Sequence, residues 1–154
     1  MKNLVILIFA LLHVSCTTDN RVRIFLVKDN YEGPIVLIQE DSTANYPKIN
    51  GDTIYFDFTK SNIFRCKGKF IEGTFSLSSI NYIYVDSLGN TQKIEFMLKS
   101  NSLVDENSVY VYPKYSQIRT NSQCDLICRS KYLDYFLERQ QELCDSLFAV
   151  RVTR

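Results

Sequence analysis

Most of this chain alternates apolar and polar side chains with the two-residue period of half-buried β-strands. Residues 21–27 show this alternation, and residues 53–58 place Ile, Phe and Phe on one face. Residues 35–38 (Ile-Val-Leu-Ile) are apolar on both faces, which is typical of a central strand. Turn residues separate these segments at short intervals. The pattern predicts a mainly β fold, a β-sandwich of about seven short strands in a domain spanning residues 21–115.

The clearest local prediction is a β-hairpin in the second half of this domain. Residues 74–85 are rich in β-forming side chains, Ser87-Leu88-Gly89-Asn90 is a turn signal, and residues 93–98 alternate again. A last strand, residues 109–112, is expected to stop at Pro113 because proline removes a ladder donor.

Beyond residue 116 the period becomes helical. Ser122 and Asp125 are spaced like a capping box. Apolar residues then recur at about 100° per residue and share one face of a helix: Leu126, Leu133, Phe136, Leu137, Cys144 and Leu147. We expect an amphipathic C-terminal helix, continuous or broken near residue 130, within a helical segment (residues 116–154) packed on the sheet.

The N-terminus has the layout of a secretory signal peptide. Lys2 precedes nine unbroken apolar residues, 4–12, which are too few to span a bilayer. Val14, Ser15 and Cys16 resemble the processing site of a bacterial lipoprotein, although His13 stands where leucine is usual. This resemblance implies a lipoprotein signal peptide at residues 1–15, acylation of Cys16 and a tether at residues 16–20. The alternative is ordinary cleavage that leaves Cys16 free or disulfide-bonded.

Thr17 follows that cysteine, where aspartate would retain an enteric lipoprotein at the inner membrane. The resemblance therefore implies a lipid-anchored protein of the outer membrane of a Gram-negative bacterium, with the membrane as partner through the N-terminal lipid. Four other cysteines, Cys66, Cys124, Cys128 and Cys144, remain as disulfide candidates, an even number that can pair in an oxidising compartment.

Three complete pairings of these four cysteines are open. On the expected helix Cys124 and Cys128 lie about 40° apart, and Cys144 lies on the opposite face, so a straight helix would join Cys144 to neither. Cys66 could then tie the sheet to the helix. A four-cysteine zinc site is the alternative, but Cys66 and Cys144 do not form a second close pair, so we expect no metal.

Composition excludes several kinds of chemistry. With Lys2 of the leader set aside, 17 of the 18 Lys and Arg residues remain against 17 Asp and Glu, so nothing favours nucleic acid as a partner. The pair Arg21 and Arg23 is expected on the solvent side of a strand. The only histidine is His13, inside the leader, so the mature chain has no Ser-His-Asp triad, Cys-His pair or histidine metal site. We expect no cofactor and no enzymatic activity.

Tyr82, Tyr84, Tyr110 and Tyr112 alternate along two expected strands. If these strands are neighbours, the four rings form an aromatic platform for a glycan or peptide. The alternative is that the helix packs on this patch, or that the rings only coat a sheet.

Two pairs of adjacent carboxylates in loops, Glu40/Asp41 and Asp105/Glu106, are the only candidates for acid chemistry. A glycosidase needs two opposed carboxyl groups about 5–10 Å apart, which neighbours in sequence do not imply. We expect these side chains to be solvated.

The stretch from Ile24 to Val36, with Tyr31-Glu32-Gly33-Pro34 at its centre, resembles an uncharacterised family of small lipoproteins typical of Bacteroidota. The resemblance covers about residues 21–98 and implies a compact, prealbumin-like β-domain with a Tyr-x-Gly-Pro turn and no known activity. Asp41-Ser42-Thr43 and Asp86-Ser87-Leu88 also resemble O-glycosylation acceptors of that bacterial group.

Taken together, these features predict a cell-envelope lipoprotein, a non-catalytic binding or structural module with an envelope protein or a glycan as partner. The alternative is a carboxylate-dependent envelope hydrolase acting on glycans or peptides.

Overall fold

The computed structural model describes residues 20–71, 79–97, 105–117 and 122–149. The elements within these ranges are β1 (Val22–Lys28), β2 (Gly33–Ile38), β3 (Lys48–Asn50), β4 (Thr53–Phe58), β5 (Ile63–Arg65), β6 (Ile80–Val85), β7 (Thr91–Phe96), β8 (Val109–Gln117), β9 (Ser122–Arg129), the 3-10 turn η3 (Ser130–Tyr132) and α2 (Leu133–Ala149). The prediction of a mainly β fold with a C-terminal helix is confirmed.

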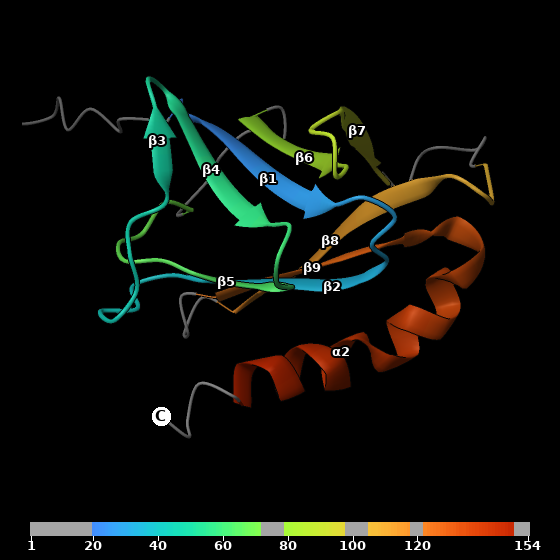
Figure 1. Ribbon diagram of the computed structural model, residues 1–154. Helices are drawn as coiled ribbons and strands as arrows, with labels where there is room; N and C mark the ends of the chain where they lie inside the picture. Colours follow the sequence, from blue (N-terminus) through green and yellow to red (C-terminus); the bar gives the residue numbers. More distant parts are fainter. Residues whose placement is uncertain (1–19, 72–78, 98–104, 118–121, 150–154) are drawn as a thin grey trace, which may run out of the picture.

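The nine strands form one sheet in the order β3-β4-β1-β6-β7-β8-β9-β2-β5. The sheet curls so that β1 and β4 lie across from β2 and β5, and α2 runs beneath the outer face of β2 and β9 (Figure 1). The molecule is thus a half-barrel with one helix on its outside. The predicted sandwich of about seven strands is wrong, because β2, β5, β8 and β9 continue the same sheet rather than forming a second one.

The inside of the curl holds the main core. Aromatic rings dominate it: Phe25 of β1 contacts Phe56, Phe58 and Tyr82, with ring centroids 4.5–5.8 Å apart. Aliphatic side chains from β2, β6, β7, β8 and β9 fill the remainder. Smaller clusters on the outer face, around Cys124 and Cys128, receive α2. Two apolar surfaces, one inside and one beneath the helix, explain why β2 is buried along its whole length.

The first strand reverses one expectation. Arg23 is 0% exposed and shares the inward face with Phe25, so its predicted position on the solvent side is wrong. Its guanidinium donates from Nε to the Phe70 carbonyl at 2.8 Å and from a terminal nitrogen to the Arg21 carbonyl at 2.7 Å. Because burial of a charge is tolerable only with hydrogen bonds, these carbonyls keep the arginine inside.

Residues 122–129 form a strand, so the helix predicted from Ser122 is wrong there; α2 begins only at Leu133. The segment Leu126-Ile127-Cys128 is apolar on both faces, a pattern that fits a buried strand as well as a helix. β8 and β2 each pair antiparallel with β9, and the hydrogen bonds of these two ladders stabilise the strand over a helix.

The expected domain boundary at residue 115 also changes. It falls inside β8, which continues past Pro113 to Gln117 with a register shift between Pro113 and Tyr115. The segment 116–154 expected as helical therefore contains β9 as well as α2. The predicted hairpin is confirmed, because β6 pairs antiparallel with β7 through the turn at Gly89. In the described ranges, neither helical element has the length and apolar character needed to span a bilayer.

Candidate functional site

A pocket of about 290 Å³ lies where the parallel strands β1 and β4 end. Lys28 closes β1, and the chain from Phe58 to Asn62 leaves β4 along the other side. Two lysines, Lys28 and Lys60, thus line a pocket whose wall also includes Tyr31 and Phe58. The Thr59 hydroxyl donates to Asp57 at 2.6 Å and the Ser61 oxygen accepts from the Ile63 amide at 3.1 Å, so one can still accept and the other can still donate a hydrogen bond.

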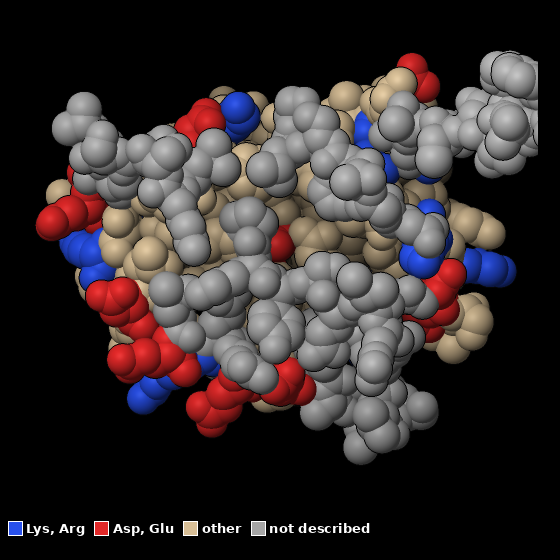
Figure 2. All heavy atoms as spheres, turned by 180° about the vertical axis from the view of Figure 1, so that it is seen from behind, with Lys and Arg blue, Asp and Glu red and all other residues tan. Residues whose placement is uncertain are grey.

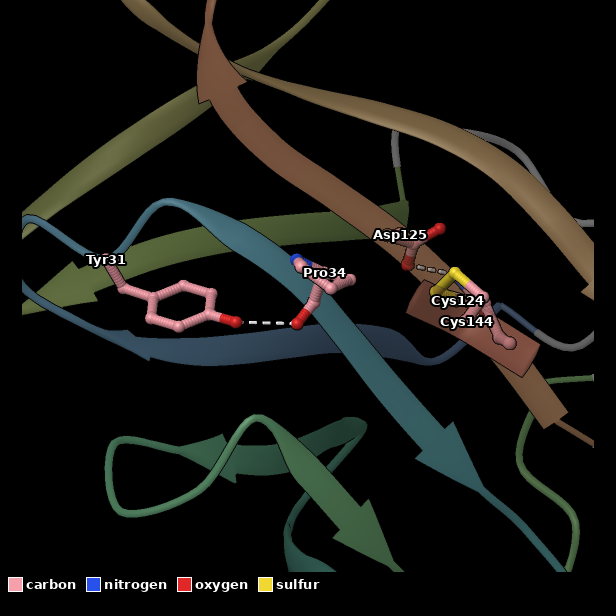
Figure 3. Close-up of a disulfide and its surroundings, with 6 residues drawn as sticks. Tyr31, Pro34, Cys124, Asp125 and Cys144 are labelled. Atoms are coloured by element: carbon pink, nitrogen blue, oxygen red, sulfur yellow. Dashed lines mark hydrogen bonds between the residues drawn. A yellow bond between two sulfur atoms is a disulfide. The ribbon is translucent and has the colours of Figure 1, made fainter. Parts of the chain in front are cut away.

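The loop between β1 and β2 shapes this pocket through Tyr31. Its hydroxyl donates to the Pro34 carbonyl at 2.6 Å, which folds the loop back on itself (Figure 3). Burial raises the pKa of Tyr31, and a hydrogen bond with Asn62 opposes that shift. Gly33 has φ +144°, and a Cβ there would lie 3.0 Å from the Tyr31 hydroxyl oxygen. The Tyr-x-Gly-Pro sequence therefore encodes the wall of the pocket.

The same loop is tied to the start of the helical segment. Glu32 forms an ion pair with Arg129 and also accepts a hydrogen bond from the Arg129 amide at 3.1 Å. Arg129 ends β9, directly before η3 and α2. The loop, the pocket wall and the start of the helix are therefore held as one unit.

A second polar group lies inside the half-barrel, on β6 and β9. Asp125 is 2% exposed, and its carboxylate accepts hydrogen bonds from the Tyr82 hydroxyl and the Gln123 amide. Burial raises the pKa of Asp125 to about 6, although both hydrogen bonds oppose this. The pKa of Tyr82 is raised by its burial and by the neighbouring carboxylate. Asp125 is thus a buried carboxyl group that is a weaker acid than an ordinary aspartate. The sequence analysis expected this residue on a helix.

The four predicted tyrosines do not form one platform. β7 separates β6 from β8, so the two pairs are not on neighbouring strands. Tyr82 and Tyr84 are buried inside the curl, whereas Tyr110 and Tyr112 pack on the opposite face, in the cluster that also holds Leu133 and Phe136 of the helix. The alternative reading, a helix packed on tyrosines, is confirmed for the β8 pair.

The cysteines pair differently from the expectation. Cys124 on β9 is bonded to Cys144 on α2, with 6.2 Å between their Cα atoms (Figure 3). The argument that Cys144 could not reach Cys124 is wrong, because Cys124 lies on a strand under the helix. Cys66 is free and buried on the inner face, Cys128 is free and buried on the outer one, and burial raises both pKa values to about 12. The four cysteines do not lie in one cluster, because Cys66 and Cys128 are on opposite faces of the sheet, and the described residues contain no group of three metal-ligand side chains.

The aspartate of each predicted carboxylate pair has a structural role. Asp41 accepts from the backbone and hydroxyl of Thr43 and forms an ion pair with Arg65 at 3.2 Å, and these contacts lower the pKa of Asp41. Asp105 accepts from the Asn107 amide and the Ser108 hydroxyl, which lowers its pKa. Hydrogen bonds to the charged form explain both shifts. These loop carboxylates stabilise turns.

Sequence reasoning missed the pocket because its parts are distant in the chain. Lys28 and Lys60 meet only because β1 and β4 run parallel, and alternation alone does not reveal which strands pair or in which direction. The one usable signal was Tyr31-Glu32-Gly33-Pro34, whose glycine and proline mark a shaped turn.

No family model matches the chain, and no curated protein matches it significantly in sequence. Among solved structures, one from Bacillus anthracis, described as a candidate lipoprotein, is similar at 14% identity and a TM-score of 0.48, over 70% of each chain. At this score the similarity supports no conclusion about this chain. The resemblance to lipoproteins of Bacteroidota stays a prediction, as do the site at Cys16 and the signal peptide, which lie outside the described residues.

Proposed function

We propose that this chain is a lipid-anchored cell-envelope protein whose folded domain is a non-catalytic binding module. The leader and Cys16 support export and lipidation. The observation that carries the proposal is the buried bridge between Cys124 and Cys144, because structural disulfides persist in oxidising compartments and are rare in the cytosol. Thr17 after the lipidated cysteine favours the outer membrane.

The pocket at the ends of β1 and β4 supports a ligand with an acidic group and hydroxyls, such as a uronic-acid sugar. Lys28 and Lys60 supply positive charge, the small polar side chains supply hydrogen bonds, and the rings of Tyr31 and Phe58 offer apolar faces. A volume of about 290 Å³ suits one or two sugar units rather than a larger compound.

Asp125 is the observation that favours the rival function, a carboxylate-dependent hydrolase. A buried carboxyl group with a raised pKa is typical of a general acid. Against it, Asp125 is the single buried acidic residue among those that the structure describes, and its oxygen is engaged by Tyr82 and Gln123. Glycan hydrolysis requires a second carboxyl group opposite the first.

Lipidation is tested by intact-mass analysis of the N-terminal peptide from the membrane fraction and by incorporation of labelled palmitate. We expect a peptide that begins at an acylated Cys16 and loss of the label in Cys16→Ala, with Cys66→Ala as the matched control that keeps it. Alkylation without reduction should modify two of the four remaining cysteines, Cys66 and Cys128, once the chain is unfolded. An intact leader in a cytoplasmic chain would refute the proposal.

Ligand binding is tested by titrating glucuronic and galacturonic acid oligomers into the mature protein. We expect Lys28→Gln and Lys60→Gln each to weaken binding about tenfold, as the loss of a charge-assisted hydrogen bond implies. Lys93→Gln is the matched control, because Lys93 pairs with Glu95 on the exposed face of β7. Equal loss in the control would refute binding at this pocket, and hydrolysis of the oligomer that Asp125→Asn abolishes would support the rival.

A further inference from the structure

The point where the described chain enters the fold, which we call the tether end, lies opposite the pocket in the half-barrel. The Val22 amide donates to the Asp52 carbonyl at 2.8 Å, so the chain enters the fold beside the turn between β3 and β4. The pocket lies where β1 and β4 end, and a strand of seven residues is about 20 Å long. Figure 1 shows the start of β1 next to that turn.

The tether end carries a group of apolar, aromatic and basic side chains, which we call the β3 patch: the exposed Tyr46, Lys48, Ile49 and Lys67 and the half-buried Tyr55. Tyr46 is 64% exposed and Ile49 is 48% exposed. The Lys67 ammonium lies 5.7 Å from the centre of the Tyr46 ring, and the Lys48 ammonium lies 5.8 Å from that of Tyr55. β3 is an edge strand, and its three residues are all exposed.

We propose that the β3 patch lies on the surface of the bilayer that holds the lipid anchor, among anionic headgroups, and that the pocket consequently opens away from the membrane. The inference rests on the proposed lipidation of Cys16. Four residue steps separate Cys16 from Asn20 and span at most about 14 Å. A domain on so short a linker faces the bilayer with the end at which the linker joins it.

The chemistry of the patch suits this occupant. Tyrosine rings with a polar tip and lysines with long apolar stems are the side chains that settle at a membrane interface. Around the β3 patch, Lys48, Lys67 and Lys69 are exposed, against Glu40 and Asp52. The excess of positive charge is attracted by anionic lipid.

A second aromatic group at the other end, which we call the helix patch, has similar side chains but not the same charge. Its Tyr132 and Tyr135 are 43% and 55% exposed and lie beside Lys131 and Arg139. Asp134 and Glu138 are exposed beside these two cations, and Glu142 and Asp145 are exposed further along α2, on either side of the bridged Cys144. In Figure 2 acidic side chains are most numerous along the left and lower edges, where α2 lies in the turned view. The helix patch therefore has no excess of positive charge that would attract anionic lipid.

The chain contains no tryptophan, so one introduced tryptophan is a unique reporter. The mature lipidated protein is placed in vesicles of phosphatidylcholine with about one-third phosphatidylglycerol, with bromine on the upper part of the acyl chains to quench nearby tryptophan. Ile49→Trp reports the β3 patch, and Tyr135→Trp reports the helix patch as the matched control. We expect strong quenching of the first variant and little of the second.

Adding Lys48→Gln and Lys67→Gln to the Ile49→Trp variant should lower the ratio of docked to undocked domains by roughly 25-fold, at about fivefold for each lysine. Stronger quenching of Tyr135→Trp, or no quenching of either variant on a chain shown by mass to be lipidated, would overturn the inference while the proposed anchor stands. Shielding of the Ile49→Trp reporter that depends on protein density and not on bromine would show a second copy on the patch, which also overturns it. A chain without lipid would instead refute the proposed function.

Discussion

The two ends of the half-barrel are held together by different means. At the tether end, the Cys124–Cys144 bridge fixes the second half of α2 to β9, next to the closing residues of β2. At the pocket end, the loop before β2 is held by the Tyr31 hydroxyl and by the ion pair of Glu32 with Arg129. A disulfide holds the first end, and polar contacts that a ligand can alter hold the second. We infer that the anchor end is the rigid base and that binding belongs to the adaptable end.

The largest expected effect is loss of the covalent clamp. Cys144→Ala should lower the free energy of unfolding by roughly 3 to 3.5 kcal/mol, because the bridge closes a loop between residues 20 apart. Urea unfolding with and without reductant measures it. Reduced wild type should match the variant, and Cys128→Ala should keep its dependence on reductant. If reductant has no effect on the wild type, the tether end is not held by the bridge.

Between the ends, Asp125 should give the interior its own pH dependence. Its pKa of about 6 in the fold exceeds the ordinary value near 3.9, so the folded state binds the proton more tightly than the unfolded state. The contribution of Asp125 to the free energy of unfolding is therefore fully present below about pH 4, and about 2 to 3 kcal/mol of it is lost as the pH rises to about 6. Urea midpoints across this range test the slope, which Asp125→Asn should remove.

At the tether end, Asp41 should make stability depend on pH in the opposite direction. Hydrogen bonds from Thr43 hold the pKa of Asp41 below its ordinary value. Its contribution is present above the unfolded pKa and is lost as the pH falls through the lower, folded value. Asp41→Asn should therefore flatten the acid side of the stability curve and leave the slope between pH 4 and 6. A change confined to that slope would contradict the assignment.

Alanine substitutions at two glycines, one at each end, compare how much the backbone tolerates a side chain there. Gly33→Ala should cost about 2 kcal/mol, because φ +144° is strained for alanine and the new Cβ meets the Tyr31 ring. Gly51→Ala, in the turn between β3 and β4, should cost about 1 kcal/mol, because φ is +56° and no atom lies within 4 Å. Thermal unfolding of both variants ranks them. Gly33→Ala should also weaken ligand binding, and Gly51→Ala should not.

The smallest effect concerns the ion pair at the pocket end. Glu32→Gln should lower the free energy of unfolding by about 0.5 to 1 kcal/mol, because the pair with Arg129 is only partly screened by solvent. Glu95→Gln removes the exposed pair with Lys93 and should change stability by less than about 0.5 kcal/mol. Equal effects in urea unfolding would mean that the Glu32 pair does not hold the loop.

The local pattern was sufficient for part of this fold. Alternation in residues 53–58 placed Ile54, Phe56 and Phe58 on the inner face, and the turn at Gly89 placed the hairpin of β6 and β7. Alternation failed where both faces of a strand are buried. Leu126-Ile127-Cys128 has no polar face, so the choice of strand rested on the ladders that β2 and β8 supply.

The sequence by itself determined the β character and the turns, because these depend on neighbours along the chain, and it predicts a leader with a candidate lipid site. Only the tertiary structure decided which cysteines pair, on which face Arg23 lies, and that Lys28 and Lys60 meet at one pocket. The physical reason is that strand pairing joins residues distant in sequence, and a two-residue period is the same for every partner, direction and curvature of the sheet.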